Sequence, residues 1–320
     1  MASINTTKPV SEQTTPGSEH APRKRLSAAV AALRPHQWIK NILLFVPLLA
    51  AHVWGDLNKV LAAVIAAVAF CACSSAIYLL NDLLDIEADR LHPAKARRAF
   101  AAGHLSVPYG LALACGLLVL ALTLSATLLP RPFVLTLVVY IVLNALYSTW
   151  LKRKVMIDVL LLAGLYVLRL LAGGAANGIP ISEWLIALSL FLFTSLAFAK
   201  RYAELARVAN EGGQTASGRG YRVSDLSMIE NQGTTSGYLA VLVLALYLNS
   251  GQVRELYRLP SALWLCCPLL MYWINRLWFV ARRGELTEDP IVFAFTDRVS
   301  LMLALIVAAL GAIATYGVPF

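Results

Sequence analysis

The 320-residue chain is 59% hydrophobic and only 14% charged, and its formal net charge is +9. About 25% of the residues of a soluble globular protein are charged, so this composition and the mean hydropathy of +0.68 exclude that class. The apolar residues form runs of bilayer length without the alternation of barrel strands. This pattern predicts an all-α polytopic membrane protein.

The chain begins with a polar segment. Residues 1–25 have no apolar run and are rich in Ser, Thr, Pro and Glu, which predicts a disordered cytoplasmic tail rather than a signal peptide. Residues 25–40 are typical of an amphipathic interfacial helix that enters the membrane near Lys40, with a simple basic anchor as the alternative. Residues 26–320 are predicted to form a single transmembrane domain.

Hydropathy predicts nine membrane-spanning helices. The first is short and is interrupted by Pro47. The predicted spans cover residues 41–55, 60–80, 107–128, 132–148, 155–175, 182–200, 237–250, 260–280 and 298–318.

The basic residues are unevenly distributed over the predicted loops. With a cytoplasmic N-terminus, 22 of the 27 Lys and Arg residues lie on the cytoplasmic side, 4 lie on the opposite side and Arg169 lies within a span. The positive-inside rule therefore places the N-terminus in the cytoplasm and the C-terminus across the plasma membrane. The longer loops, 81–106 and 201–236, share the cytoplasmic side, where we expect the active site.

Three aspartates follow the second predicted span. On a continuous helix, Asp82, Asp85 and Asp89 share one face within about 60°. Their mutual repulsion predicts a bound cation, and carboxylates that leave room for substrate phosphate suit Mg²⁺. A basic run from Arg90 to Arg98 follows, which is typical of a Mg²⁺–diphosphate site. The alternative is a solvated helix end with ordinary positive-inside residues.

The segment NDLLDIEADRLHPAKARR at residues 81–98 resembles the first aspartate-rich motif of the UbiA-type intramembrane prenyltransferases, NDxxDxxxD followed by a basic patch in a nine-helix bundle. Residues 33–50, 147–176, 199–205 and 297–305 resemble the branch of decaprenyl-phosphate phosphoribosyltransferases. The resemblance covers about residues 30–318. Ala99 stands where that motif usually continues with proline, which is a departure in the shape of this loop.

The resemblance implies a reaction of cell-envelope biosynthesis. A polyprenyl phosphate attacks C1 of phosphoribosyl pyrophosphate, and pyrophosphate leaves with its charge held by Mg²⁺. The alternative, as in the rest of the superfamily, is transfer of a prenyl group from a prenyl diphosphate to an aromatic or other small acceptor. The one-sided basic charge argues against a transporter or flippase. No nucleic-acid partner is expected, and homo-oligomerisation is left open.

The resemblance also implies the site residues. Asp82, Asp85 and Asp89 match the catalytic, metal-binding motif. The residues that match substrate-binding or phosphate-binding positions are Asn81, Lys95, Arg98, Tyr147, Lys152, Arg169, Lys200, Arg201, Tyr202 and Glu204. Lys40, Arg219 and Arg222 are further phosphate-binding candidates. For the lysines, ordinary positive-inside charge is the alternative.

Three features have open roles. The Gly-rich segment 206–236 departs from the branch and is predicted to be a lid that supplies a second carboxylate, Asp225; a surface loop is the alternative. Arg169, a costly charge within a span, is either a structural clamp or a ligand contact. Asp297 and Arg298 are expected to form a structural ion pair with Asp289 or with the bases that follow the second span.

Overall fold

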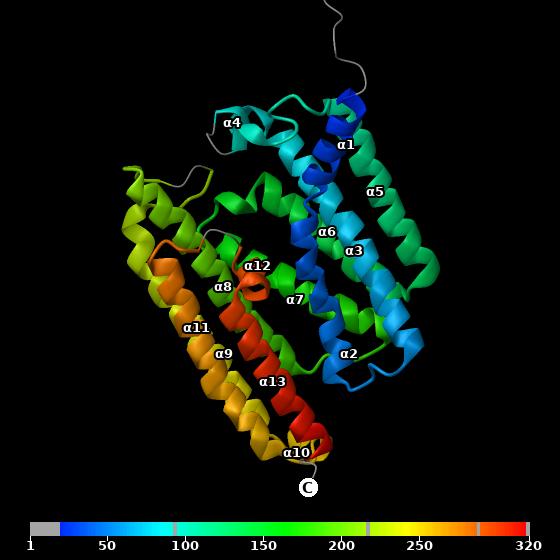
Figure 1. Ribbon diagram of the computed structural model, residues 1–320, viewed down its shortest axis with the longest axis vertical. Coiled ribbons are helices and arrows are strands. Elements are labelled where there is room, and N and C mark those ends of the chain that lie inside the picture. The colour runs from blue at the N-terminus through cyan, green and yellow to red at the C-terminus, as the bar shows by residue number, and fades with distance from the viewer. Residues whose placement is uncertain (1–19, 92–94, 216–217, 287–288, 318–320) are drawn as a thin grey trace, which may run out of the picture.

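The computed structural model describes residues 20–91, 95–215, 218–286 and 289–317. Within these ranges the chain is a bundle of helices without a β-strand, which confirms the predicted all-α class (Figure 1). The long helices are α3 (Leu57–Leu84), α5 (Val107–Leu128), α6 (Arg131–Thr149), α7 (Ile157–Asn177), α8 (Glu183–Asn210), α9 (Leu226–Leu248), α11 (Cys266–Arg282) and α13 (Arg298–Tyr316). The short helices that follow α3 in the chain are α4 (Ile86–Arg90), η2 (Lys95–Arg97), η3 (Leu151–Arg153), η4 (Val223–Asp225), α10 (Gly251–Leu256), η5 (Pro260–Leu265) and α12 (Pro290–Thr296).

Seven helices of the described residues are long and apolar enough to cross a membrane. They are α3, α5, α6, α7, α8, the continuous pair η5–α11, and α13. The first predicted span falls on the short helices η1 (Pro35–Phe45) and α2 (Val46–Ala50), and the seventh falls on the second half of α9. The total of nine spans therefore stays a prediction.

The N-terminal segment differs from its prediction. Helix α1 (His20–Leu33) begins within the predicted tail, and residues 1–19 lie outside the described ranges, so the disordered tail stays a prediction. The predicted interfacial helix also ends at Leu33, because a proline disfavours the α conformation of the residue before it. Arg34, before Pro35, instead adopts a left-handed conformation with φ 53° and ψ 58°.

Helix α7 occupies the centre of the bundle, where it contacts η1, α3, α6 and α8 (Figure 1). Its buried face carries small residues, which allow helices to approach closely in membranes. At Gly173 the backbone of η1 comes so near that a Cβ atom would overlap the carbonyl oxygen of Leu44. This contact fixes η1, which carries Lys40, against α7.

We expect Gly173→Ala to destabilise the protein by about 2–3 kcal/mol, because the obstructing Leu44 atoms belong to the backbone. Gly164→Ala in the same helix is the matched control, since nothing lies within 4 Å of a Cβ at that position. Thermal unfolding of the detergent-solubilised variants measures the difference. Equal melting temperatures for the two variants would contradict the close contact.

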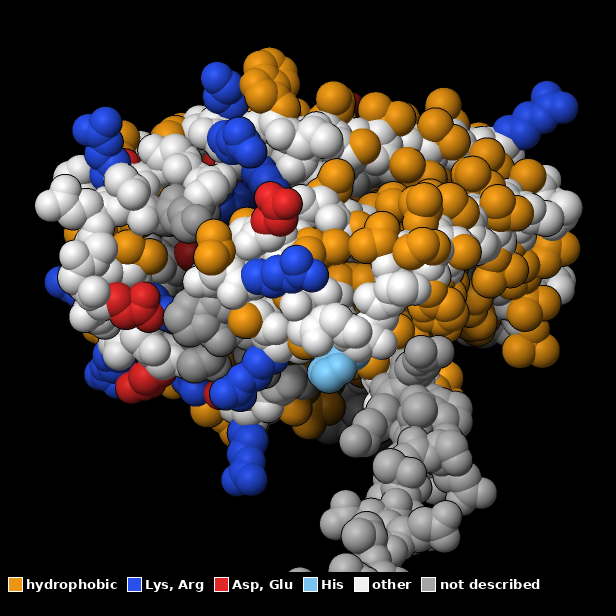
Figure 2. All heavy atoms as spheres, turned by 90° about the horizontal axis from the view of Figure 1, so that it is seen from above, with side chains coloured by type: hydrophobic (Ala, Val, Ile, Leu, Met, Phe, Trp, Pro, Cys, Tyr) orange, Lys and Arg blue, Asp and Glu red, His pale blue; other side chains and the backbone are white. Residues whose placement is uncertain are grey.

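Charged side chains gather at one end of the bundle. Helices α1 and α4 lie at one end, called the site end below, and the C-terminal end of α13 lies at the other (Figure 1). Figure 2 looks onto the site end: charged side chains gather over one part of it, and hydrophobic side chains cover most of the remainder. The polar part of the site end is therefore suited to binding charged ligands.

Candidate active site

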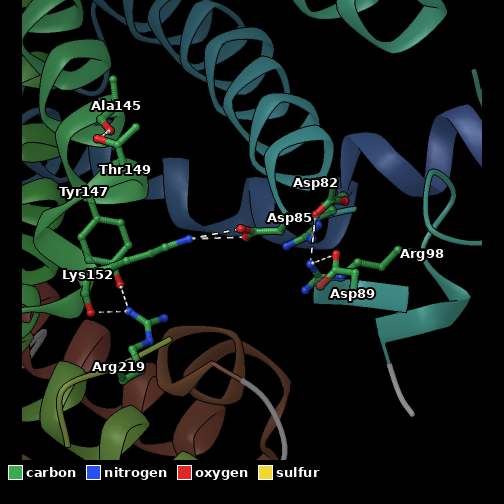
Figure 3. Close-up of polar contacts among 10 residues, drawn as sticks. Asp82, Asp85, Asp89, Arg98, Ala145, Tyr147, Thr149, Lys152 and Arg219 are labelled. Carbon is green, nitrogen blue, oxygen red and sulfur yellow. Dashed lines mark hydrogen bonds and ion pairs between the residues drawn. The ribbon is translucent and has the colours of Figure 1, made fainter. Parts of the chain in front are cut away.

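The aspartate motif does not lie on one continuous helix. Helix α3 ends at Leu84 and α4 begins at Ile86, while Asp85 between them has φ −100° and ψ 9°. The predicted single stripe of carboxylates was therefore wrong. Asp82 and Asp89 face Arg98, whereas Asp85 points across the mouth of the bundle to Lys152 (Figure 3).

Three cations from distant parts of the chain neutralise the motif. Arg98 Nη1 donates to Asp82 Oδ1 at 3.1 Å and to Asp89 Oδ2 at 2.7 Å, and Arg34 Nη2 donates to Asp82 Oδ1 at 2.6 Å. Lys152 Nζ lies 3.4 Å from both carboxylate oxygens of Asp85. Arg34 was not among the predicted site residues, because its sequence neighbourhood indicated only a membrane anchor.

The motif suits a metal that arrives with its ligand rather than a preformed protein cage. Within the described ranges, no group of three or more His, Cys, Asp or Glu residues is placed to hold a metal ion. The atoms that could bind a metal here are nevertheless carboxylate oxygens, which Mg²⁺ prefers as ligands together with water and phosphate oxygens. The Asp85 side chain is 40% exposed and its contact with Lys152 is long. Asp85 is therefore the most accessible of the three.

A cavity of about 160 Å³ lies beside this motif and is rich in cations and phenols. Its walls carry the predicted residues Lys40, Asn81, Tyr147, Arg169, Lys200 and Arg219. They also carry the tyrosines Tyr78, Tyr140 and Tyr166, which were missed from the sequence. The seven-residue spacing of Tyr140 and Tyr147 places both on one face of α6 and was an available signal. Four fixed cations in one cavity favour an anionic ligand.

Asp289 joins two of the cavity cations. Its Oδ2 accepts from Lys40 Nζ and from Lys200 Nζ, both at 2.8 Å, and its Oδ1 accepts from Tyr166 at 3.4 Å. Burial alone would raise the pKa of Asp289, but Lys200 and Lys40 outweigh it and hold the pKa well below its ordinary value. The carboxylate therefore stays ionised and fixes both ammonium groups at the cavity wall.

We expect Asp289→Asn to destabilise the protein by about 3 kcal/mol near neutral pH, because Lys40 and Lys200 lose their counterion. The folded-state pKa is lower than the unfolded value of about 3.9, so ionised Asp289 stabilises the fold fully above that value. The difference between wild type and variant should therefore shrink as the pH falls below about 4. Thermal unfolding between about pH 3 and 7 tests this; a pH-independent difference would contradict it.

Arg169 acts as a clamp. Its Nε donates to Asn41 Oδ1 at 3.1 Å, Nη1 to the Leu165 carbonyl at 2.8 Å and Nη2 to the Tyr140 hydroxyl at 2.7 Å. The guanidinium carbon also lies 5.3 Å from the ring centroid of Tyr166. These bonds satisfy a charge buried within a span and join η1, α6 and α7. These bonds favour a structural role of Arg169 over a ligand contact. Arg169 is also one of the residues that line the cavity.

Arg201 lies behind the cavity wall. It is 2% exposed, and its Nε lies 2.8 Å from Asp158, which has no exposed surface. Its Nη2 donates to the Tyr147 hydroxyl at 3.0 Å, and its Nη1 pairs with Glu204. Arg219 donates to the same hydroxyl at 2.8 Å. Arg201 and Glu204 thus support Tyr147 and Arg219 and do not themselves line the cavity.

Other predicted residues lie apart from the cavity. Lys95 is exposed on η2, Arg222 is exposed near η4, and the ring of Tyr202 packs edge-on against Trp278 in the core. Asp225 accepts from the Arg222 N–H at 2.8 Å, so it caps a local turn and is not a second carboxylate of the site.

The predicted partner of Asp297 was also wrong. Asp297 forms its ion pair with Arg276, at 2.7 Å, and caps the first turn of α13 by accepting from the Ser300 N–H. Asp289 was not available to it or to Arg298, because that carboxylate is held by Lys40 and Lys200.

Sequence comparison identifies relatives over most of the chain. The chain is 37% identical over 281 residues to uncharacterized protein y4nM of Sinorhizobium fredii, covering 88% of this chain but only about half, 54%, of that protein. It is 35% identical over 279 residues to nodulation protein NoeC of Azorhizobium caulinodans, covering 86% of this chain and 89% of NoeC. It is 32% identical over 305 residues to decaprenyl-phosphate phosphoribosyltransferase of Mycobacterium tuberculosis, covering 92% and 97%.

Structure comparison agrees on the fold. A UbiA homologue from Archaeoglobus fulgidus bound to GPP and Mg²⁺ superposes with a TM-score of 0.66 at 16% identity, covering 89% of this chain and 99% of that one. A digeranylgeranylglyceryl phosphate synthase gives a TM-score of 0.61 at 16% identity, covering 91% and 98%. The sequence profile of the UbiA prenyltransferase family matches residues 42–301. The chain is therefore a membrane protein of the UbiA prenyltransferase family.

Proposed function

We propose that the protein transfers a 5-phosphoribosyl group from phosphoribosyl pyrophosphate to a polyprenyl phosphate and releases pyrophosphate. The observation that carries this proposal is the presence of two adjacent regions suited to anions. One is the aspartate motif with its three cations, and the other is the cavity with Lys40, Arg169, Lys200 and Arg219. The similarity to decaprenyl-phosphate phosphoribosyltransferases, at 32% identity or more, supports the same choice.

The aspartate motif would bind the pyrophosphate part of the donor. Asp82, Asp85 and Asp89 would hold Mg²⁺, which supplies positive charge to the leaving pyrophosphate. Arg98 and Lys152 pair with these carboxylates, and both could donate to phosphate oxygens of a bound donor if the carboxylates held Mg²⁺. In such a site the buried charges are paired with one another when the ligand is absent and with the ligand when it is bound. No charge is therefore left without a partner in either case.

The cavity would bind the phosphate of the lipid acceptor. Lys200 and Arg219 line this cavity, and the phosphate monoester needs no general base because it is already anionic. Its oxygen forms the new bond to C1 while the bond between C1 and pyrophosphate breaks. The role of the chain is to hold the two anions close together in the required orientation.

The alternative reaction, prenyl transfer to an aromatic acceptor, suits this cavity less well. An aromatic acceptor carries at most the single charge of a carboxylate, less than that of a phosphate monoester, and so matches less well a cavity whose cations are opposed by Asp289 and by Glu204, 3.9 Å from Arg219. The tyrosine rings that could stabilise an allylic cation already face fixed cations. Arg34 lies 5.1 Å from the centroid of Tyr78, Arg169 lies 4.9 Å from that of Tyr140 and Arg219 lies 5.8 Å from that of Tyr147.

We also propose that the site end faces the cytoplasm of a plasma-membrane protein. The basic loops gather there, as the positive-inside rule requires, and a soluble phosphorylated donor would reach the aspartate motif from that side. Helix α1 and the C-terminal end of α13 lie at opposite ends of the bundle (Figure 1). The C-terminus would then lie across the membrane.

Incubation of the purified protein with Mg²⁺, phosphoribosyl pyrophosphate and a polyprenyl phosphate tests the reaction. Mass spectrometry should detect a phosphoribosylated lipid, and chelation of the metal should abolish its formation. A parallel incubation supplies a prenyl diphosphate and 4-hydroxybenzoate. Product in the second incubation alone would overturn the proposal in favour of prenyl transfer.

A further inference from the structure

Residues 219–221, in the loop between α8 and α9, pack against the turn before α7 and the start of that helix. Tyr221 in this loop is 3% exposed and lies among core residues. Its neighbour Gly220 lies so close to the turn before α7 that a Cβ atom would be 2.7 Å from the Arg153 carbonyl oxygen. The loop and the turn therefore form one packed unit.

The Tyr221 hydroxyl forms two hydrogen bonds that join the loop to the turn before α7 and to α7 itself. It accepts from the Met156 N–H at 2.9 Å and donates to Asp158 Oδ1 at 2.7 Å. Met156 has φ 69°, which is uncommon for a residue other than glycine, so its backbone needs such support. Burial and the hydrogen bond to Asp158 raise the pKa of Tyr221, and the phenol therefore keeps the proton that it donates.

A series of polar contacts connects Asp158 to the residues that line the cavity. Asp158 pairs with Arg201, whose Nη2 donates to the Tyr147 hydroxyl at 3.0 Å, and Arg219 donates to that hydroxyl at 2.8 Å. The Tyr147 oxygen accepts two guanidinium hydrogens, so its own hydrogen remains to be donated to a ligand. Arg219 lies two residues before Tyr221, and its side chain lines the cavity.

We propose that Tyr221 is a positioning residue that latches the loop between α8 and α9 and thereby presents Arg219 and Tyr147 to a phosphate in the cavity. The loop then acts as a fixed wall of the site rather than as the opening lid predicted from its glycines. The identity of the phosphate rests on the proposed function, but the latch itself does not.

Tyr221→Phe tests the latch, because it keeps the ring and removes the hydroxyl. Tyr238→Phe is the control: Tyr238 is exposed on α9 and its hydroxyl donates to Asn275 at 2.6 Å, away from the cavity. Limited trypsin digestion of the full-length protein in detergent should cut after the exposed Arg222 several-fold faster in Tyr221→Phe than in wild type or control. Unchanged cleavage of Tyr221→Phe would overturn the latch, whatever the substrates.

A double-mutant cycle tests the link to the cavity. We expect Tyr221→Phe and Arg219→Gln each to raise the KM for the phosphorylated acceptor by about tenfold with less effect on kcat, and the double variant to be no worse than Arg219→Gln alone. If the increases in KM of the two single variants multiply in the double variant, Tyr221 does not act through Arg219. If no variant, including wild type, forms the phosphoribosylated lipid while Tyr221→Phe still digests faster, the proposed function fails and the latch stands.

Discussion

The Asp85→Ala variant is expected to keep its fold and to lose turnover by about a hundredfold or more. Asp85 is the accessible carboxylate of the motif, and its 3.4 Å contact with Lys152 contributes little to stability because both groups are partly exposed. Removing it takes away a ligand for the metal and the leaving group, whose charge develops in the transition state. Initial rates of phosphoribosyl-lipid formation measure the loss, and a melting temperature measures the fold.

The matched control for Asp85→Ala is Glu87→Ala. Glu87 is an exposed acid two residues further along, in the first turn of α4. Its loss changes the net charge by the same amount, so turnover that falls equally in both variants would indicate a general electrostatic effect and not a ligand. A fully active Asp85→Ala protein would refute the assignment of the motif.

Asp82→Ala should behave differently from Asp85→Ala. Asp82 is 4% exposed and accepts from both Arg34 and Arg98, so its removal leaves two guanidinium groups without this partner. We therefore expect a loss of stability together with the loss of turnover.

Helix positions were predicted well where apolar runs have polar or turn-forming flanks. The predicted span 107–128 coincides with α5, which begins after Ser106 and has Pro108 in its first turn. The predicted span 182–200 lies within α8, which continues to Asn210 because the segment AELARVAN favours helix beyond the apolar run. Hydropathy therefore locates the membrane-crossing part and not the end of the helix.

The break at Asp85 could not be predicted from local sequence. The segment LLDIEADR favours a continuous helix, and what accompanies the break is the pairing of Asp85 with Lys152, 67 residues away. The role of Asp289 was hidden for the same reason, since its partners Lys200 and Lys40 lie 89 and 249 residues away. Residue type indicated which charges matter, and only the fold shows how they pair.

Lys200→Gln is expected to raise the KM for the polyprenyl phosphate by about twentyfold, which corresponds to the loss of one charge-assisted hydrogen bond of roughly 2 kcal/mol. The protein should remain folded, because Asp289 keeps its bond to Lys40. Arg207→Gln is the matched control, since Arg207 is exposed on the same helix and does not line the cavity. Steady-state kinetics with varied acceptor measure both variants.

An unchanged acceptor KM in Lys200→Gln would exclude the cavity as the site of the lipid phosphate. The double variant Lys200→Gln/Tyr221→Phe distinguishes direct binding of the phosphate from positioning of another residue. Lys200 is held by Asp289, whereas Tyr221 acts through Asp158 and Arg219, so the two changes share no hydrogen-bond partner. Their effects on KM should therefore multiply, in contrast to the non-additive pair Tyr221→Phe and Arg219→Gln. This contrast separates a cation that binds the phosphate directly from a residue that only positions one.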